Sequence, residues 1–406
     1  MLAVVLDSPS KEFFPLGYVQ AAAGVCRPLW VVLRPDEETA HWLRLLRRSG
    51  DVVDVAALTA AAAAAAIGVF APAGIVCFGE ANAQWTAQVA KELGIRYHSP
   101  RTAALLTDKL QQRAALRDHG LRTPQAWDPG PLRDDAAAIR DVEAAAAFPL
   151  AARPRLGRSR GGCDPLRTPA QLRAAVAADR LEPVLLEELV ATASQPVTGA
   201  GNASRVSVEF LVSRGEPVLL SVTGRYHVAD PVRWGVFVPA EIAEEMRDEV
   251  VAAAAAAVPA LGIEDGPLQV EVAMTDEGPV LMDANPWLGS SALPVLLDHA
   301  LGIDVFRVAM LAAIGEHPVP VALPWPTDVA FSFCVAPPPD GRGRTATDRI
   351  DALGGISGIV EVMSCLSPEE TSTASVIQVS GIAPDHDARR RMEQRIRSVI
   401  AAPEAS

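Results

Sequence analysis

The sequence predicts a mixed fold, α/β at its amino-terminal end and α+β further on, and three observations support this. Residues 1–100 alternate short apolar runs with amphipathic helical patterns, as in a small parallel sheet. Two later segments, 205–227 and 266–289, each contain two alternating strand patterns around a tight turn, which predicts antiparallel hairpins. Beyond residue 318, three more strand patterns precede a charged terminal helix, so this part is predicted to be mainly β.

Composition limits the class of protein. The chain has 406 residues, of which 50% are hydrophobic and 21% charged, so it can bury the cores of two or three domains. Its formal net charge of −13 argues against a nucleic-acid partner, because such binders concentrate positive charge on one face. The five cysteines form no C-x-x-C pair and are expected to be reduced thiols, which indicates a cytoplasmic protein.

No membrane segment is expected. The amino terminus has too short an apolar run for a signal peptide, and no basic region precedes that run. The longest apolar tract, 250–263, is interrupted by Pro259 and is too short to span a bilayer.

The first hundred residues are expected to shape a substrate cleft or to support the next domain. No G-x-G-x-x-G follows the first strand, LAVVL, so a dinucleotide site is not predicted. A helix is predicted near Thr102 and a second over 108–119, capped by Thr107 or Asp108. Lys109 lies in the first turn of the second helix, where a cation is mildly disfavoured, so it is either functional or an ordinary surface residue.

Residues 148–177 predict a strand, a glycine-rich basic loop, and a helix after Thr168. Glycines let backbone amides approach an anion and arginines supply positive charge, so the loop favours a phosphate site over an exposed turn. It lacks the Walker lysine pattern. The residues concerned are Arg153, Arg155, Gly157, Arg158, Arg160, Gly161 and Gly162.

Two further segments carry charge. Residues 183–189, PVLLEEL, predict a buried strand that ends in Glu187 and Glu188. The hairpin at 205–227 turns at 213–216 and leads into a loop whose mixture of side chains can bind a small carboxylate and an organic group. His227 in this loop is by itself more often structural than a ligand. The mixture consists of Arg225, Tyr226, His227, Arg233 and Trp234.

The hairpin at 266–289 gathers polar side chains on one face. Its predicted register pairs are Met274 with Val280, Glu271 with Asp283, and Gln269 with Asn285. Its predicted apolar face holds Val270, Val272, Met274, Val280, Met282 and Ala284. Directly opposed carboxylates repel each other by about 3 kcal/mol at an effective dielectric near 20. The polar face is therefore solvated, shares a proton, or holds a hard cation such as Mg²⁺, which prefers oxygen ligands.

Taken in order, these motifs resemble those of the ATP-grasp superfamily, specifically its carboxylate–amine ligases, which include L-amino acid ligases. TDK at 107–109 with the following HGLRTP resembles the entry segment of that family, and FPLAARP with the glycine-rich loop resembles its phosphate lid. LLEEL resembles the hinge strand that holds adenine, and GPLQVEVAMTDEGPVLMDANP resembles the metal-binding end. The order of the motifs makes the resemblance specific, and it covers nearly the whole chain.

The resemblance divides the chain into four parts. Residues 1–100 would form the amino-terminal α/β domain, 101–185 the lid subdomain, 186–318 the metal and nucleotide subdomain, and 319–406 a β-rich carboxyl-terminal subdomain. The proline-rich stretch HPVPVALPWP would join the last two.

In such enzymes ATP phosphorylates a carboxylate, and an amine then displaces phosphate to give an amide. The resemblance implies ATP and Mg²⁺, or Mn²⁺, as cofactors. It assigns nucleotide binding to Lys109, Arg153, Arg158, Ser159, Gly161, Gly162, Glu187, Glu188 and Leu189. It assigns metal binding to Glu271, Asp283 and Asn285.

Several residues depart from the family pattern. Arg153 stands where lysine is usual, and Asp283 stands where glutamate is usual. Arg205 lies about where a ribose-binding acid would be. Trp287 stands where an arginine commonly touches phosphate. That charge has to come from elsewhere, and the expected catalytic residues are Arg225 and Arg233.

The predicted function is therefore an ATP- and Mg²⁺-dependent ligase that joins a carboxylic acid, with an amino acid favoured, to an amine. Two alternatives stay open. One is a nucleotide-binding protein of this fold with impaired catalysis, and the other is a carboxylase that uses bicarbonate. The expected partners are small molecules, with no nucleic acid and no membrane, and the sequence leaves a homodimer open.

Overall fold

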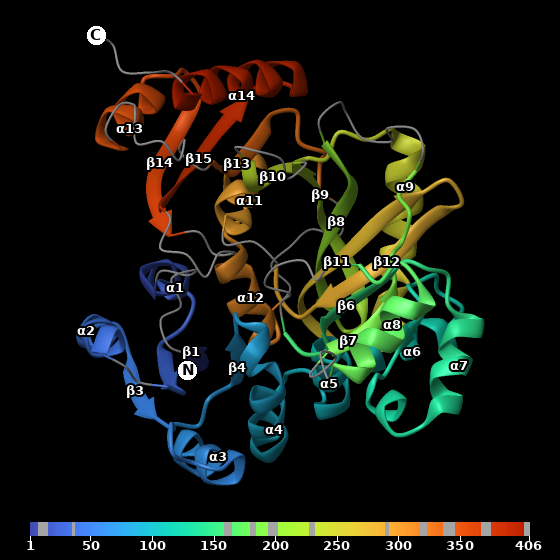
Figure 1. Ribbon diagram of the computed structural model, residues 1–406. Helices are drawn as coiled ribbons and strands as arrows, with labels where there is room; N and C mark the ends of the chain where they lie inside the picture. Colours follow the sequence, from blue (N-terminus) through green and yellow to red (C-terminus); the bar gives the residue numbers. More distant parts are fainter. Residues whose placement is uncertain are drawn as a thin grey trace.

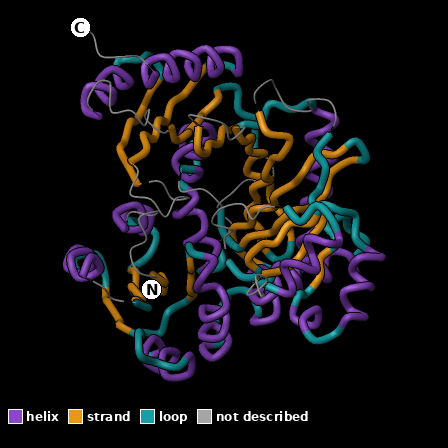
Figure 2. Tube along the Cα trace, in the orientation of Figure 1, coloured by secondary structure: helices purple, strands orange, loops and turns teal. Residues whose placement is uncertain are grey.

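The computed structural model describes residues 1–6, 15–34, 37–157, 165–178, 184–193, 202–226, 232–288, 292–316, 323–335, 346–366 and 375–401. Within these ranges the strands form three sheets of four, three and eight strands. Figure 2 shows helices on the outer sides of these sheets and also in the centre of the molecule. No helix in the described ranges has both the length and the apolar character needed to cross a membrane.

The amino-terminal domain is a four-stranded parallel sheet in the order β3-β2-β1-β4, as the alternating sequence pattern predicts. Its buried strands are runs of valine, leucine and isoleucine, because helices cover both faces of a parallel sheet. The strands are β1 (Leu2–Leu6), β2 (Pro28–Val32), β3 (Asp51–Asp54) and β4 (Gly74–Cys77). The helices are α1 (Pro15–Ala22), α2 (Glu37–Leu46), α3 (Ala60–Gly68) and α4 (Ala83–Leu93), with a 3₁₀ turn at Glu80–Asn82.

A small antiparallel sheet in the order β5-β7-β6 follows, packed against α7 and α8. Its strands are β5 (Ala126–Trp127), β6 (Leu150–Pro154) and β7 (Val184–Glu188). The helices of this part are α5 (Pro100–Thr107), α6 (Lys109–Asp118), α7 (Ala136–Ala145) and α8 (Pro169–Ala177), with a 3₁₀ turn at Gly130–Arg133. Figure 1 shows this sheet and its helices beside the hairpin of β11 and β12.

The largest sheet has the strand order β12-β11-β8-β9-β10-β13-β15-β14. Because β10 pairs with β13, the carboxyl-terminal strands extend this sheet. The strands are β8 (Asn202–Ser213), β9 (Glu216–Tyr226), β10 (Val232–Val238), β11 (Asp265–Thr275), β12 (Gly278–Asn285), β13 (Val329–Val335), β14 (Ile359–Leu366) and β15 (Ser375–Ala383). Helices α13 (Ala346–Gly354) and α14 (His386–Ala401) pack against the last three strands, as Figure 1 shows.

Two long helical stretches of the sequence are each divided into two helices. The apolar pattern over 240–261 forms α9 (Glu244–Ala255) and α10 (Ala257–Leu261), and the pattern over 292–314 forms α11 (Leu293–Leu301) and α12 (Val305–Ala313). The second division has a clear cause. Gly302 ends α11 in the left-handed conformation, and the Asp304 side chain caps α12 by accepting from the Arg307 backbone.

One face of the large sheet buries the main apolar core. Alternate residues of β8 and β11, including Val206, Val208 and Val270, pack with α9, α10 and residues of α5 and α6. Period-two alternation therefore turns the intervening polar residues of the same strands to the opposite face. Helix α12 lies between β4 and β11, so it connects the amino-terminal domain to the large sheet (Figure 1).

Candidate active site

The hairpin of β11 and β12 has the predicted pairing at its polar end. Glu271 lies opposite Asp283, and Gln269 lies opposite Asn285, so both predictions are confirmed. Asp276 and Glu277 form the loop between the paired residues Thr275 and Gly278. The charged pair is thus brought together by the local sequence alone.

The predicted pairing of Met274 with Val280 is wrong, because a bulge interrupts the register. Val272 pairs with Leu281, which leaves Met282 as an extra residue on β12, and Met274 pairs with Pro279. Beyond the bulge the faces are exchanged. Leu281 packs in the main core, while Val280 and Met282 pack with Ala273 on the polar face, contrary to the predicted apolar set.

Polar residues of β8 lie beside the polar face of the hairpin. Together they form what we call the patch, which consists of Ser207, Glu209, Gln269, Glu271, Asp283 and Asn285. Ser207 pairs with Glu271, and Glu209 pairs with Gln269. Both residues of β8 are buried, and the Glu209 side chain is 0% exposed. Burial raises the pKa of Glu209 to about 7, against the opposing effects of its hydrogen-bond donors and of Arg225.

Helix α6 brings Lys109 to the patch. The Asp108 carboxylate caps the helix by accepting from the Leu110 and Gln111 backbone, as predicted, and Arg155 donates to both of its oxygens at 2.8–3.1 Å. Burial would raise the pKa of Asp108, but these hydrogen bonds lower it. Lys109 is only 4% exposed and its Nζ donates to the Gly157 carbonyl, so it is not an ordinary surface residue.

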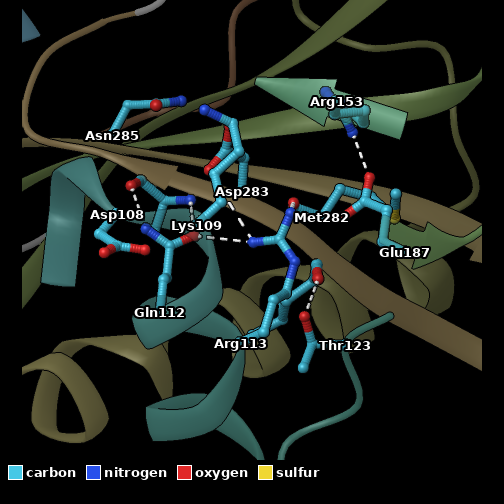
Figure 3. A network of polar contacts seen from close by, with 12 residues as sticks. Asp108, Lys109, Gln112, Arg113, Thr123, Arg153, Glu187, Met282, Asp283 and Asn285 are labelled. Atoms are coloured by element: carbon cyan, nitrogen blue, oxygen red, sulfur yellow. Dashed lines mark hydrogen bonds and ion pairs between the residues drawn. The ribbon is translucent and has the colours of Figure 1, made fainter. Parts of the chain in front are cut away.

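Two residues on the next turn of α6, Gln112 and Arg113, hold strand β12 in place. Gln112 donates to the Ala284 carbonyl at 2.8 Å and accepts from the Ala284 N–H at 2.9 Å. Arg113, whose side chain is fully buried, donates to the carbonyl of Met282 in the bulge and lies 4.0 Å from Asp283. Figure 3 shows the Arg113 guanidinium directed at this strand, beside Asp283.

Glu187 on β7 lies between two arginines. Its Oε1 accepts from Arg153 at 2.7 Å, and its Oε2 lies 3.4 Å from Arg113. Burial would lower the pKa of Arg153, but the charge of Glu187, with Asp283 and Glu271 further away, raises it. The small sheet, α6 and the hairpin are thus joined at a buried ionic cluster, visible in Figure 3.

Arg225 and Arg205 complete the positive charge on the patch. Arg225 donates to Glu271 Oε1 at 2.7 Å. The Arg205 side chain forms no hydrogen bond or ion pair with any residue in the described ranges, although the residue is half-buried. Burial lowers the pKa of Arg205, while the charge of Glu271 raises it and the nearby Arg153 and Arg225 lower it.

Trp287, two residues beyond Asn285, is buried among aromatic rings. It packs edge to face on Phe78 at a centroid distance of 4.8 Å and is stacked on Phe306 at 5.6 Å. Tyr18 of α1 contacts the same two phenylalanines. The cluster therefore joins the amino-terminal domain and α12 to the segment that follows β12.

Comparison with known proteins identifies the fold. No protein-family model and no curated protein matches the sequence. Among solved structures, the L-amino acid ligase from Bacillus licheniformis superposes with a TM-score of 0.74 at 17% identity, covering 98% of this chain and 96% of that one. The chain has the ATP-grasp fold.

Two other ATP-grasp structures agree over the same length. The N5-carboxyaminoimidazole synthase from Aspergillus clavatus, in complex with ADP and 5-aminoimidazole ribonucleotide, has a TM-score of 0.71 at 14% identity and covers 98% of each chain. The third structure is the biotin carboxylase domain of the 2-oxoglutarate carboxylase from Hydrogenobacter thermophilus, a dimer with MgADP, ADP and bicarbonate. It has a TM-score of 0.65 at 14% identity, and the match covers 100% of this chain and 90% of that one. The predicted fold class is therefore confirmed.

The structure gathers many of the residues predicted for this ATP-grasp site. Lys109, Arg153, Glu187, Arg225, Glu271, Asp283 and Asn285 lie in one connected cluster. Glu188 accepts from the Ala147 N–H at 3.0 Å, and Leu189 is 49% exposed. Arg158, Ser159, Gly161 and Gly162 lie outside the described residues, as does the Arg233 side chain on β10. The individual roles of all these residues stay predictions.

The oxygen atoms of the patch fit a hard cation. Glu271, Asp283 and Asn285 offer carboxylate and amide oxygens on adjacent strands, and Asn285 directs its NH₂ group at Gln269 and so leaves its carbonyl oxygen available. No group of three or more His, Cys, Asp or Glu suited to a metal occurs in the described ranges. Burial raises the pKa of Asp283, while Arg113 and Lys109 lower it.

Sequence reasoning missed three residues of the cluster. Gln112 and Arg113 lie three and four residues after Lys109, so helical periodicity places them near the same side of α6 and could have found them. Glu209 follows Ser207 at the strand period, on the face opposite Val208. The alternation was visible, but which strand would lie beside β11 was not.

Proposed function

We propose that this protein is an ATP- and Mg²⁺-dependent ligase that activates a carboxylate as an acyl phosphate and couples it to an amine, releasing ADP and phosphate. The acid class favoured is an amino acid. The observation that carries the proposal is the cluster of oxygen ligands on β11 and β12 facing Lys109 and several arginines, within an ATP-grasp fold.

Charge supports this assignment. Five cationic side chains meet three carboxylates and the Glu209 carboxyl group, whose pKa burial raises to about 7, so the described cluster keeps an excess of positive charge. The cations are Lys109, Arg113, Arg153, Arg205 and Arg225, and the three carboxylates are Glu187, Glu271 and Asp283. An excess of fixed positive charge beside a divalent-cation site suits a polyanion such as ATP.

The residues of the chain would act mainly by positioning and electrostatics. Glu271, Asp283 and Asn285 would hold Mg²⁺ or Mn²⁺, which when bound neutralises charge on the transferred phosphoryl group. Lys109 and Arg153 would bind the phosphates, with the lid residues Arg158, Ser159, Gly161 and Gly162 excluding water. Glu187, Glu188 and Leu189 belong to the hinge strand proposed to hold adenine.

Arg225 and Arg233 are proposed as catalytic residues because Trp287 cannot supply a charge. Arg225 already reaches Glu271, and β10, which carries Arg233, pairs with β9, which carries Arg225. A guanidinium stabilises negative charge that develops on phosphate oxygens during acyl phosphate formation. No side-chain nucleophile is required for this chemistry.

The test is release of ADP and phosphate from the purified protein with mixtures of carboxylic acids and amines, followed by product mass. We expect release that depends on both substrates and on Mg²⁺. Glu271→Gln should lower turnover by at least about 100-fold, since metal stabilisation amounts to several kcal/mol. Glu277→Gln, in the exposed turn of the same hairpin, is the control. Full turnover in a folded Glu271→Gln protein would falsify the metal assignment.

The two alternatives give different results in the same assay. A protein with impaired catalysis would bind ATP without substrate-stimulated ADP release, and the burial of Trp287 is the observation that favours it. A carboxylase would release ADP when bicarbonate replaces the organic acid, as the bicarbonate complex of the Hydrogenobacter thermophilus neighbour suggests. A homodimer and a cytoplasmic location stay predictions.

A further inference from the structure

We infer that Glu209 is a positioning residue of the metal site, which acts through Gln269 to fix the direction in which Asn285 presents its amide oxygen. The inference rests on the proposed function, because it concerns the cation that this function requires. Glu209 lies on β8, next to β11 in the sheet, and its side chain is completely buried.

Three side chains form a continuous relay across β8, β11 and β12. Glu209 Oε1 accepts from Ser207 Oγ at 2.7 Å and from Gln269 Nε2 at 3.2 Å. Gln269 Oε1 in turn accepts from Asn285 Nδ2 at 3.4 Å. Gln269 is 1% exposed, so water competes little for its amide group.

The direction of the relay follows from the groups at its ends. A side-chain amide has one accepting and one donating side, so Asn285 can offer its oxygen to a cation only if its NH₂ group points elsewhere. That NH₂ group meets the oxygen of Gln269, whose own NH₂ group must then point to Glu209. Because Glu209 Oε1 is an acceptor, it sets the orientation of both amides.

Protonation of Glu209 leaves this direction unchanged. Its Oε2 has no hydrogen-bond partner among the residues that the structure describes, whereas Oε1 has two donors. A proton would therefore reside on Oε2, and Oε1 would continue to accept from Gln269. An accepting oxygen, with or without a full negative charge, is what the relay requires.

Binding of Mn²⁺ in the presence of ADP, followed by electron paramagnetic resonance, tests the inference without turnover. Glu209→Leu removes the accepting oxygen, and Gln269→Met breaks the middle of the relay. Both should weaken Mn²⁺ binding by about 10-fold, as the loss of a group that orients a metal ligand does. The conservative Glu209→Gln keeps one accepting oxygen and should restore binding to within about 2-fold. Glu216→Leu, exposed on β9, is the control.

The outcomes separate this inference from the proposed function. Wild-type affinity in a folded Glu209→Leu protein overturns the inference, and so does an equal loss in Glu209→Gln, because charge would then be the cause. If Glu209→Leu does not fold, Gln269→Met and Glu209→Gln decide in the same way. Absence of Mn²⁺ binding by the wild-type protein overturns the proposed function as well, whereas Mn²⁺ binding that is the same in every variant overturns the inference alone.

Discussion

Two buried glutamates in this protein, Glu187 and Glu209, are equally removed from solvent but differently compensated. Glu187 is 1% exposed and meets the guanidinium groups of Arg113 and Arg153. Glu209 is 0% exposed and accepts hydrogen bonds from the neutral donors Ser207 and Gln269, with the charge of Arg225 further away. The first arrangement joins three structural parts by charge, while the second orients neutral groups within one sheet.

The difference shows that burial alone does not define the role of a carboxylate. A buried charge needs a partner of opposite sign, and removing that partner leaves a large desolvation penalty. A buried carboxyl group with neutral partners instead keeps its proton to a higher pH, as the raised pKa of Glu209 indicates. Two substitutions test this contrast directly, and two more test the cations that surround it.

Loss of a cation from the Glu187 cluster should have the largest effect. Arg113→Met leaves Glu187 with one partner and the Met282 carbonyl with none from this side chain, so we expect the free energy of unfolding to fall by about 3–5 kcal/mol. Urea denaturation measures it. Arg122→Met is the matched control, because the pair between Arg122 and Glu277 is exposed and should contribute no more than about 1 kcal/mol. Equal effects of the two variants would contradict the contrast.

Titration of Glu209 should have the next largest effect on stability. Between pH 4.5 and about 7 the folded protein keeps a proton that the unfolded chain has lost, so the contribution of Glu209 to stability is lost as pH rises through this window. As pH rises through that window, the free energy of unfolding of Glu209→Gln should increase by about 3 kcal/mol relative to that of the wild type. Urea denaturation from pH 5 to 8 measures this. Parallel curves for both proteins would show that Glu209 does not retain its proton, and Glu216→Gln, at the exposed start of β9, is the control.

Lys109 tests the cationic side of the site. It forms no ion pair in the described ranges and donates to the Gly157 carbonyl, so its charge is available to a phosphate. Lys109→Met should weaken binding of a non-hydrolysable ATP analogue by about 10-fold, which is the size of one lost hydrogen bond to a charged group. Calorimetric titration measures it, with the exposed Lys91→Met as control. Unchanged affinity would remove Lys109 from the site.

The smallest effect on stability is expected for Arg205, whose side chain has no hydrogen-bond or ion-pair partner among the described residues. Arg205→Met should leave the free energy of unfolding within about 0.5 kcal/mol of the wild type, because methionine keeps most of the apolar stem and no side-chain hydrogen bond or ion pair with a described residue is lost. It should nevertheless weaken binding of the ATP analogue, since the excess positive charge of the site falls. A loss of several kcal/mol in stability would show instead that Arg205 has a structural partner.

The local parts of the structure followed from the sequence. The alternation over 266–289 and the turn residues determined which residues of the hairpin share a face near Glu271 and Asp283, because the strand period is two. Asp108 was one of the two predicted helix caps for a similar reason, since capping depends on a few adjacent residues. The order of the motifs led to the ATP-grasp fold, which the structure confirms.

Only the tertiary structure decided the rest, because those features depend on contacts between distant segments. The bulge at Met282 reverses the faces beyond it, and Arg113 from α6 binds the carbonyl that the bulge presents. Trp287, at the position where an arginine is common in the family, packs in an aromatic cluster whose other rings come from α1, α12 and the residue after β4. Pairing of β8 with β11 places Glu209 next to Gln269, which connects it to Asn285 by hydrogen bonds. Spacing along the chain sets the local period, whereas packing and desolvation select which distant groups satisfy one another.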